Sequence, residues 1–170
     1  MKELILGGMR SGKSRLAEQH AQATNLPVTY VATATAQDDE MRQRIAHHQS
    51  QRPDHWLLVE EPIALAASLQ RHAVDGHCIL LDCLTLWLTN LLCLDDEARL
   101  RQEVDALLDA LPKLPGTVIL VSNETGMGVV PLGELTRRYC DEAGRLHQAV
   151  AARCDKVVMT VAGLPLVLKG

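Results

Sequence analysis

Gly7-Gly8-Met9-Arg10-Ser11-Gly12-Lys13-Ser14 is the stretch that decides the fold of this 170-residue chain. It has the form G-x-x-x-x-G-K-[ST], in which small residues let successive backbone N–H groups turn inward around phosphates. Residues 2–6 before it have the pattern of a short apolar strand, and residues 13–24 after it have that of a helix, whose N-terminus attracts anions. The sequence therefore predicts a P-loop that holds the phosphates of a purine nucleoside triphosphate.

Each part of this loop has an expected role. Lys13 would bridge the β- and γ-phosphates as a catalytic residue, and Ser14 would be a ligand of Mg²⁺. The alternative is a glycine-rich turn that is followed by Lys-Ser only by chance. The residues expected to contact the nucleotide here are Gly7, Gly8, Met9, Arg10, Ser11, Gly12, Lys13 and Ser14.

Apolar runs of strand length alternate with longer segments of helical period along the whole chain. Several runs are apolar without alternation, which is typical of strands covered on both faces. We predict an α/β fold: one three-layer P-loop domain over residues 1–170 with a mostly parallel central sheet. The last two runs, separated by Ala162-Gly163, could pair as a terminal β-hairpin at one edge. The expected strands are 4–6, 28–32, 56–59, 78–81, 118–121, 157–161 and 164–168, and the expected helices are 13–24, 38–51, 62–74, 83–94, 96–111 and 133–153.

Composition excludes several classes of protein. The net charge is −4 and basic residues form no sustained stripe, so we expect no nucleic-acid partner. No stretch approaches the roughly 20 apolar residues of a membrane helix, and Gly7 comes too early for a signal peptide. Five cysteines form no C-x-x-C pair, which favours reduced thiols in the core. We therefore expect a cytoplasmic protein with no membrane span.

An acidic residue outside the P-loop is a further candidate ligand of the metal. In Ile79-Leu80-Leu81-Asp82 an aspartate ends an apolar strand, as in many P-loop proteins, so Asp82 is a candidate ligand of Mg²⁺. Asp82 could also be the N-cap of the helix that follows. Many motor ATPases place a second acid directly afterwards, where this chain has Cys83. The guanine-reading Asn-Lys-x-Asp motif of switch GTPases is also missing, because the late strand ends Ser122-Asn123-Glu124. Hydrolysis as the main activity is disfavoured.

Two adjacent histidines follow an acidic helix start. On the helix expected at 38–51, His48 lies about 40° from the apolar stripe of Met41 and Ile45, and His47 lies roughly 140° from it. His48 suits a packed, hydrogen-bonded role, whereas His47 points outward. A neutral imidazole can attack the α-phosphorus of a nucleotide. The alternative for His47 is an ordinary solvated side chain.

Further motifs extend along the chain in a fixed order, and together they resemble the bifunctional adenosylcobinamide kinase / adenosylcobinamide-phosphate guanylyltransferase family. The resemblance covers residues 2–168, essentially the whole chain. The motifs are Gly7-Gly8-x-Arg10-Ser11-Gly12-Lys13-Ser14-Arg15, Tyr30-Val31-Ala32-Thr33, Asp38-Asp39-Glu40-Met41, Arg44-Ile45-x-His47-His48, Arg52-Pro53-x-x-Trp56, Thr89-Asn90-Leu91-Leu92 and Asn123-Glu124-x-Gly126-Met127-Gly128-x-Val130-Pro131.

The resemblance implies a site beyond the P-loop. His47 matches the histidine that accepts GMP covalently in that family, and Glu60 and Asp82 match residues that contribute to GTP binding. Since a carboxylate can accept hydrogen bonds from guanine N1–H and its amino group, Asp82 could read either the base or the metal. The segment 123–131 could be a mobile loop over the corrinoid or an ordinary glycine-bearing turn. The other residues implied to lie against the nucleotide are Thr33, Ala34, Thr35, His48, Gln49, Ser50 and Gln51.

The resemblance also implies two reactions in cobalamin (vitamin B12) biosynthesis. The hydroxyl of the aminopropanol arm of adenosylcobinamide takes the γ-phosphoryl group of ATP or GTP with Mg²⁺, and GMP from GTP then passes through His47 to give adenosylcobinamide-GDP. A homotrimer is implied as well, while the apolar helix at 84–94 could serve a core or an interface. A plain P-loop small-molecule kinase and a nucleotide-switch binding module are the alternatives.

Overall fold

The computed structural model describes residues 1–35 and 53–170. The expected helix at 38–51 and the candidate residues His47, His48, Gln49, Ser50 and Gln51 lie outside the described residues. Within the described part of the chain, no helix is both long enough and apolar enough to cross a membrane.

The described strands form one sheet with the order β3-β2-β4-β5-β1-β6-β7. Every neighbouring pair is parallel except β6 and β7, which pair antiparallel. Both the mostly parallel sheet and the terminal hairpin at its edge are therefore confirmed. The strands are β1 (Lys2–Gly7), β2 (Val28–Ala32), β3 (Leu57–Glu60), β4 (Cys78–Asp82), β5 (Thr117–Asn123), β6 (Lys156–Val161) and β7 (Leu164–Lys169).

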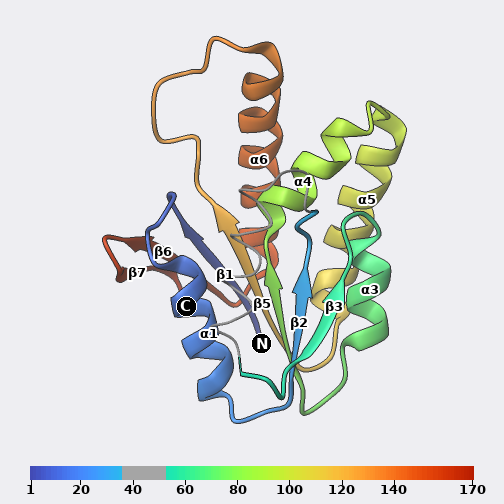
Figure 1. Ribbon diagram of the computed structural model, residues 1–170, viewed down its shortest axis with the longest axis vertical. Helices are drawn as coiled ribbons and strands as arrows, with labels where there is room; N and C mark the ends of the chain where they lie inside the picture. Colours follow the sequence, from blue (N-terminus) through green and yellow to red (C-terminus); the bar gives the residue numbers. More distant parts are fainter. Residues whose placement is uncertain (36–52) are drawn as a thin grey trace.

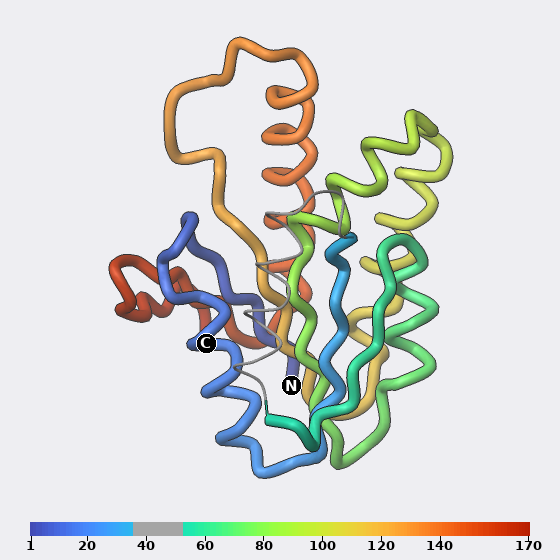
Figure 2. Tube along the Cα trace, in the orientation of Figure 1, coloured from blue at the N-terminus to red at the C-terminus, as the bar shows by residue number. Residues whose placement is uncertain are grey.

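Helices cover both faces of the sheet and complete the three layers (Figure 1). α1 packs on one face, and α3, α4, α5 and α6 pack on the other. The helices are α1 (Lys13–Ala23), α3 (Leu65–His72), α4 (Leu84–Cys93), α5 (Glu97–Ala110), the 3₁₀ turn η1 (Leu111–Lys113) and α6 (Glu134–Arg153). The segment between β5 and α6 rises beyond the carboxyl ends of the parallel strands (Figure 2).

Side chains alternate between the two faces along each central strand, because successive residues of a strand point in opposite directions. In β1, Ile5 packs with Ala17 and Ala21 of α1, whereas Leu4 packs in the core under α3 to α6. Both cores are aliphatic around a few aromatic side chains, as expected from a chain without Phe.

The apolar helix α4 belongs to the core. The Trp87 side chain is fully buried, and its indole N–H donates to the Ile63 carbonyl oxygen at 2.8 Å. Leu84, Leu88 and Leu91 are buried beside it. These side chains of α4 therefore serve the core, whereas Leu94 just after the helix is 48% exposed.

α3 begins later than the sequence predicts. A helix was expected from residue 62, but the Glu61 carboxylate accepts the backbone N–H groups of Ile63 (2.9 Å) and Ala64 (2.7 Å). Residues 62–64 therefore form a capped turn, and the helix starts at Leu65.

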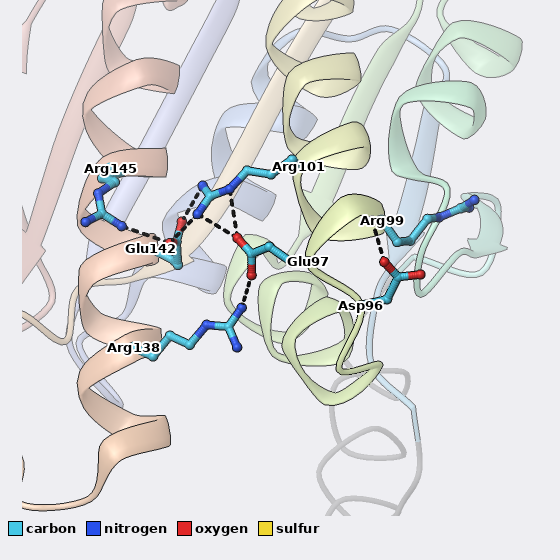
Figure 3. Close-up of polar contacts among 7 residues, drawn as sticks. All are labelled: Asp96, Glu97, Arg99, Arg101, Arg138, Glu142 and Arg145. Atoms are coloured by element: carbon cyan, nitrogen blue, oxygen red, sulfur yellow. Dashed lines mark hydrogen bonds and ion pairs between the residues drawn. The ribbon is translucent and has the colours of Figure 1, made fainter.

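An ionic cluster ties α5 to α6 (Figure 3). The Arg101 guanidinium donates to both oxygens of Glu142 at 3.0 and 2.9 Å, and these hydrogen bonds raise the pKa of Arg101 above its ordinary value. Arg145 also donates to Glu142, while Glu97 accepts from Arg101 and Arg138. The bidentate pair with the buried Glu142 holds α6 against α5.

Candidate nucleotide-binding site

The P-loop joins β1 to α1 as predicted. β1 ends at Gly7 and α1 begins at Lys13, with Gly12 in the left-handed conformation at φ 93°. The Lys13 ammonium donates to the Gly8 carbonyl oxygen at 3.3 Å, which folds its side chain back over the loop. The structure thus places a lysine, a helix N-terminus and a turn of small residues around one position, which is the arrangement that binds phosphate.

The terminal hairpin supports this loop, which the sequence did not indicate. The backbone N–H of Gly163, in the turn between β6 and β7, donates to the Ser11 carbonyl oxygen at 2.9 Å. A Cβ atom on Gly12 would lie 3.2 Å from the Gly163 Cα atom. Both glycines therefore permit close contact between the P-loop and the hairpin.

Asp82 lies at the carboxyl end of β4, on the face that α1 covers. β5 separates β4 from β1, so Asp82 is two strand spacings, roughly 10 Å, from the P-loop strand. Its Oδ2 atom accepts the hydroxyl of Tyr30 at 3.1 Å. The N-cap alternative is wrong, because Cys83 is the N-cap residue of α4 and no side chain caps this helix. The Asp82 carboxylate thus lies at the carboxyl edge of the sheet, with Tyr30 as its hydrogen-bond donor.

The Thr33-Ala34-Thr35 turn follows β2 at the same edge. Thr33 is fully buried, and its hydroxyl donates to the Cys83 carbonyl oxygen (2.7 Å) and accepts the Cys83 N–H (3.0 Å). The Thr33 carbonyl oxygen accepts the Asn90 side-chain amide at 2.8 Å. Through these bonds Thr33 holds the backbone that follows Asp82 in place. Of the three residues in this turn, only Ala34 and Thr35 are exposed enough to contact a ligand.

Glu60 ends the edge strand β3 and is exposed. Ala32 of β2 is in register with both Glu60 and Asp82, so all three residues lie along the carboxyl edge of the sheet. Glu60 is four strand spacings from β1, roughly 19 Å, which is too far for contact with phosphates held in the P-loop.

Cys83 cannot replace the second acid of a motor ATPase. The side chain is buried, and this burial raises the pKa of its thiol to about 12. A thiol that stays protonated at neutral pH does not accept a proton from water. The position after Asp82 therefore supplies no base that could activate a water molecule.

A cavity of about 430 Å³ opens beside the P-loop. The first half of the loop, Glu124 and Met127 after β5, and the end of β6 line it. Its position over the carboxyl ends of β5, β1 and β6 is where ligands bind in open α/β sheets. The sequence indicated Glu124 and Tyr30 only as parts of longer motifs, and it did not indicate the buried histidine of α6, His147.

Comparison with known proteins agrees with this geometry. The profile of the family described as cobinamide kinase / cobinamide phosphate guanyltransferase matches residues 3–168. The bifunctional adenosylcobalamin biosynthesis protein CobP of Pseudomonas aeruginosa is 64% identical over 170 residues, which cover 100% of this chain and 98% of that protein. The bifunctional adenosylcobalamin biosynthesis protein CobU of Salmonella typhimurium is 39% identical over 183 residues, with 99% and 100% covered.

Solved structures show the same fold at low sequence identity. The RadB recombinase is similar with a TM-score of 0.53 at 17% identity, over 93% of this chain and 73% of that one. The ATPase EscN of enteropathogenic E. coli is similar with a TM-score of 0.53 at 13% identity, over 94% and 41%. These likenesses support the P-loop α/β fold alone. The full-length profile match and the 64% identity place the chain itself: it belongs to the cobinamide kinase / cobinamide phosphate guanyltransferase family.

Proposed function

We propose that this chain phosphorylates adenosylcobinamide with ATP or GTP and then transfers GMP from GTP, through a guanylyl-histidine at His47, to give adenosylcobinamide-GDP. The observation that carries the proposal is a complete P-loop in a chain whose relatives are bifunctional adenosylcobalamin biosynthesis proteins. The reactions take place in one domain and in the cytoplasm.

In the kinase step the P-loop holds the triphosphate. Lys13 and the backbone amides of the loop stabilise negative charge on the γ-phosphoryl oxygens and on the leaving β-phosphate. The corrinoid hydroxyl forms a bond to the γ-phosphorus as the bond to the β,γ-bridging oxygen breaks.

The residues at the phosphate end fit Mg²⁺. The Ser14 hydroxyl lies in the first turn of α1 and the Asp82 carboxylate on the same face of the sheet, which gives the oxygen donors that Mg²⁺ takes together with phosphates. Bound there, Mg²⁺ would neutralise charge that develops on the phosphates. The hydrogen bond from Tyr30 then orients one Asp82 oxygen and holds the carboxylate at the carboxyl edge of the sheet.

In the transfer step His47 is the nucleophile. Its imidazole attacks the α-phosphorus of GTP, pyrophosphate leaves, and the phosphate of adenosylcobinamide phosphate then takes GMP from the imidazole. Glu60 is roughly 19 Å from the P-loop strand, a separation that suits a role at the guanine end rather than at the phosphates. The residue pattern around His47 and the family support this assignment.

The proposed homotrimer draws support from apolar side chains outside the core. On β7, Leu164, Leu166 and Leu168 are each more than half exposed. Light scattering on the purified protein tests the trimer directly.

Two assays on the same protein preparations separate the two reactions. Phosphorylation is followed with γ-labelled nucleotide and adenosylcobinamide, and guanylyl transfer with α-labelled GTP and adenosylcobinamide phosphate. We expect His47→Ala to abolish transfer while much of the kinase activity remains, and Lys13→Ala to lower kinase kcat by about 10²–10³-fold. Equal loss of both activities in folded His47→Ala would contradict the division of roles.

The same assays distinguish the alternatives. A plain kinase would phosphorylate the corrinoid and never transfer GMP. A nucleotide-switch module would hydrolyse GTP slowly, without dependence on the corrinoid.

A further inference from the structure

The cavity beside the P-loop combines an apolar wall with two charged residues, Arg10 and Glu124. Met9, Met127, Met159 and Val161 contribute apolar surface. Of the described residues that line it, Glu124 alone carries a carboxylate. With about 430 Å³, the cavity lies at the small end of the range of roughly 300–1,000 Å³ for ligand pockets. It has room for a short polar arm, and the bulk of a large ligand would remain outside.

Glu124 is tied directly to the phosphate loop. Its backbone N–H donates to the Gly7 carbonyl oxygen at 3.0 Å. Gly8, whose carbonyl oxygen accepts the Lys13 ammonium, lines the same cavity. Because Lys13 is the residue that reaches the β- and γ-phosphates, one wall of the cavity borders the γ-phosphate position and another carries Glu124.

The Glu124 carboxylate is held at both oxygens. Oε1 accepts the backbone N–H of Gly126 at 2.6 Å, and Oε2 lies 3.5 Å from the Nδ1 atom of His147 on α6. His147 is buried, and its Nε2 atom lies 2.8 Å from the Ser122 hydroxyl. The Ser122 hydroxyl in turn lies 3.3 Å from that of Thr85.

The donors and acceptors of this chain fix the position of the histidine proton. The Glu124 carboxylate only accepts hydrogen bonds and lies beside Nδ1, so the neutral ring carries its proton on Nδ1 and directs it at Glu124. The Ser122 hydroxyl then donates to Nε2 and can accept from the Thr85 hydroxyl. Burial lowers the pKa of His147 against the opposing effect of Glu124, which agrees with a neutral ring.

We propose that Glu124 is the general base of the kinase step and that His147 is its positioning residue. This assignment rests on the proposed function. The corrinoid arm enters the cavity with its hydroxyl against Glu124. The hydroxyl oxygen forms a bond to the γ-phosphorus, the bond from that phosphorus to the bridging oxygen breaks, and nucleoside diphosphate leaves. The hydroxyl proton moves to the Glu124 carboxylate and afterwards to water.

The residues that line the cavity indicate the kind of substrate it accepts. An aliphatic alcohol arm matches the apolar methionine side chains that line the cavity beside Glu124.

The test measures both reactions in variants of the full chain. Glu124→Gln keeps the shape and the bond to Gly126 but removes the base. We expect kinase kcat to fall by about 10²–10⁴-fold, with the KM for nucleotide and the guanylyl transfer rate changed less than about threefold. Glu134→Gln is the matched control, because Glu134 is an exposed carboxylate at the start of α6 and the charge change is the same.

Two histidine variants test positioning. In His147→Asn the side-chain amide takes the place of Nδ1–H and keeps the donor to Glu124, whereas His147→Gln takes the place of Nε2 and loses it. We expect His147→Gln to lower kinase kcat by about 10²-fold with little change in KM, and His147→Asn to retain most of the activity. A merely structural role would lower the thermal midpoint and both reactions alike in the two variants.

Each outcome decides a specific point. A wild-type protein that does not phosphorylate adenosylcobinamide overturns the proposed function and this assignment with it. An active wild type with an equally active Glu124→Gln variant overturns the assignment alone. Equal loss of kinase and transfer in folded Glu124→Gln also overturns it, because Glu124 would then serve nucleotide binding common to both steps.

Discussion

Gly7 and Gly8 are adjacent in the P-loop, but only Gly7 lacks room for a Cβ atom. Alanine at each position therefore tests the loop geometry. Gly7 is in register with Thr160 across β1 and β6. A Cβ atom on Gly7 would lie 2.3 Å from the Ser11 Oγ atom and 2.8 Å from the Thr160 carbonyl oxygen. A Cβ atom on Gly8 would meet nothing within 4 Å.

The cost follows from these contacts. The Ser11 hydroxyl can rotate away, but the Thr160 oxygen belongs to the sheet backbone, so β1 or the loop must shift. Overpacking of this kind costs about 1–3 kcal/mol of unfolding free energy. In a domain of this size, 1 kcal/mol lowers the thermal midpoint by about 2–4 °C, so Gly7→Ala should lower it by roughly 2–12 °C. Gly8→Ala should be neutral or slightly stabilising, because alanine restricts the unfolded chain.

Calorimetry on both variants measures the difference, and titration with GTP shows whether the displaced loop also binds nucleotide more weakly. Ser11→Ala in the Gly7→Ala background should restore part of the stability, since it removes the closer clash. A Gly7→Ala variant as stable as the wild type, or a Gly8→Ala variant destabilised as much, would refute the reasoning.

Three further predictions concern the core and the titrating groups. Trp87→Ala should lower the unfolding free energy by about 3–5 kcal/mol in urea titrations, because it leaves a cavity under α4; a loss below about 1 kcal/mol would mean that α4 is not packed as described. Iodoacetamide should label the exposed Cys93 in the native protein and should label the buried Cys83 only after denaturant is added. The raised pKa of the Cys83 thiol, about 12, keeps it protonated in the fold. Mass spectrometry of native and unfolded samples checks both sites. Burial lowers the pKa of His147, although Glu124 opposes it, so the unfolded state takes up the proton first as pH falls below about 6.5. Stability should drop there, and His147→Asn should flatten that part of the pH profile of unfolding free energy. An unchanged profile would mean that His147 has the same pKa in the folded and unfolded states.

The layers of the fold follow from local sequence patterns, and the order of the strands does not. Unbroken apolar runs such as 78–81 and 118–121 predicted buried parallel strands, which the structure confirms. That β5 lies between β1 and β4 depends on crossover connections, whose partners a local pattern does not specify. The same limit applies at helix ends, where the Glu61 side chain moved the start of α3 to Leu65.

The sequence predicted those parts of the candidate site whose residues are adjacent in the chain. The P-loop is contiguous, so the motif alone located Lys13 and Ser14. The Tyr30–Asp82 hydrogen bond joins residues 52 positions apart, and the Glu124–His147 contact joins a loop to the middle of a long helix. His147 has no distinguishing neighbours in sequence, because only the packing of α6 on β5 gives it Ser122 and Glu124 as partners.

The central claim is that one P-loop chain carries GMP covalently on its way to the corrinoid. The most direct measurement incubates the protein with Mg²⁺ and α-labelled GTP, then denatures one portion and adds adenosylcobinamide phosphate to the other. The account predicts acid-labile, base-stable label on the wild-type protein, its transfer to the corrinoid in the second portion, and no label on His47→Ala. Transfer of GMP to the corrinoid without any labelled protein, or label that persists in folded His47→Ala, would contradict it.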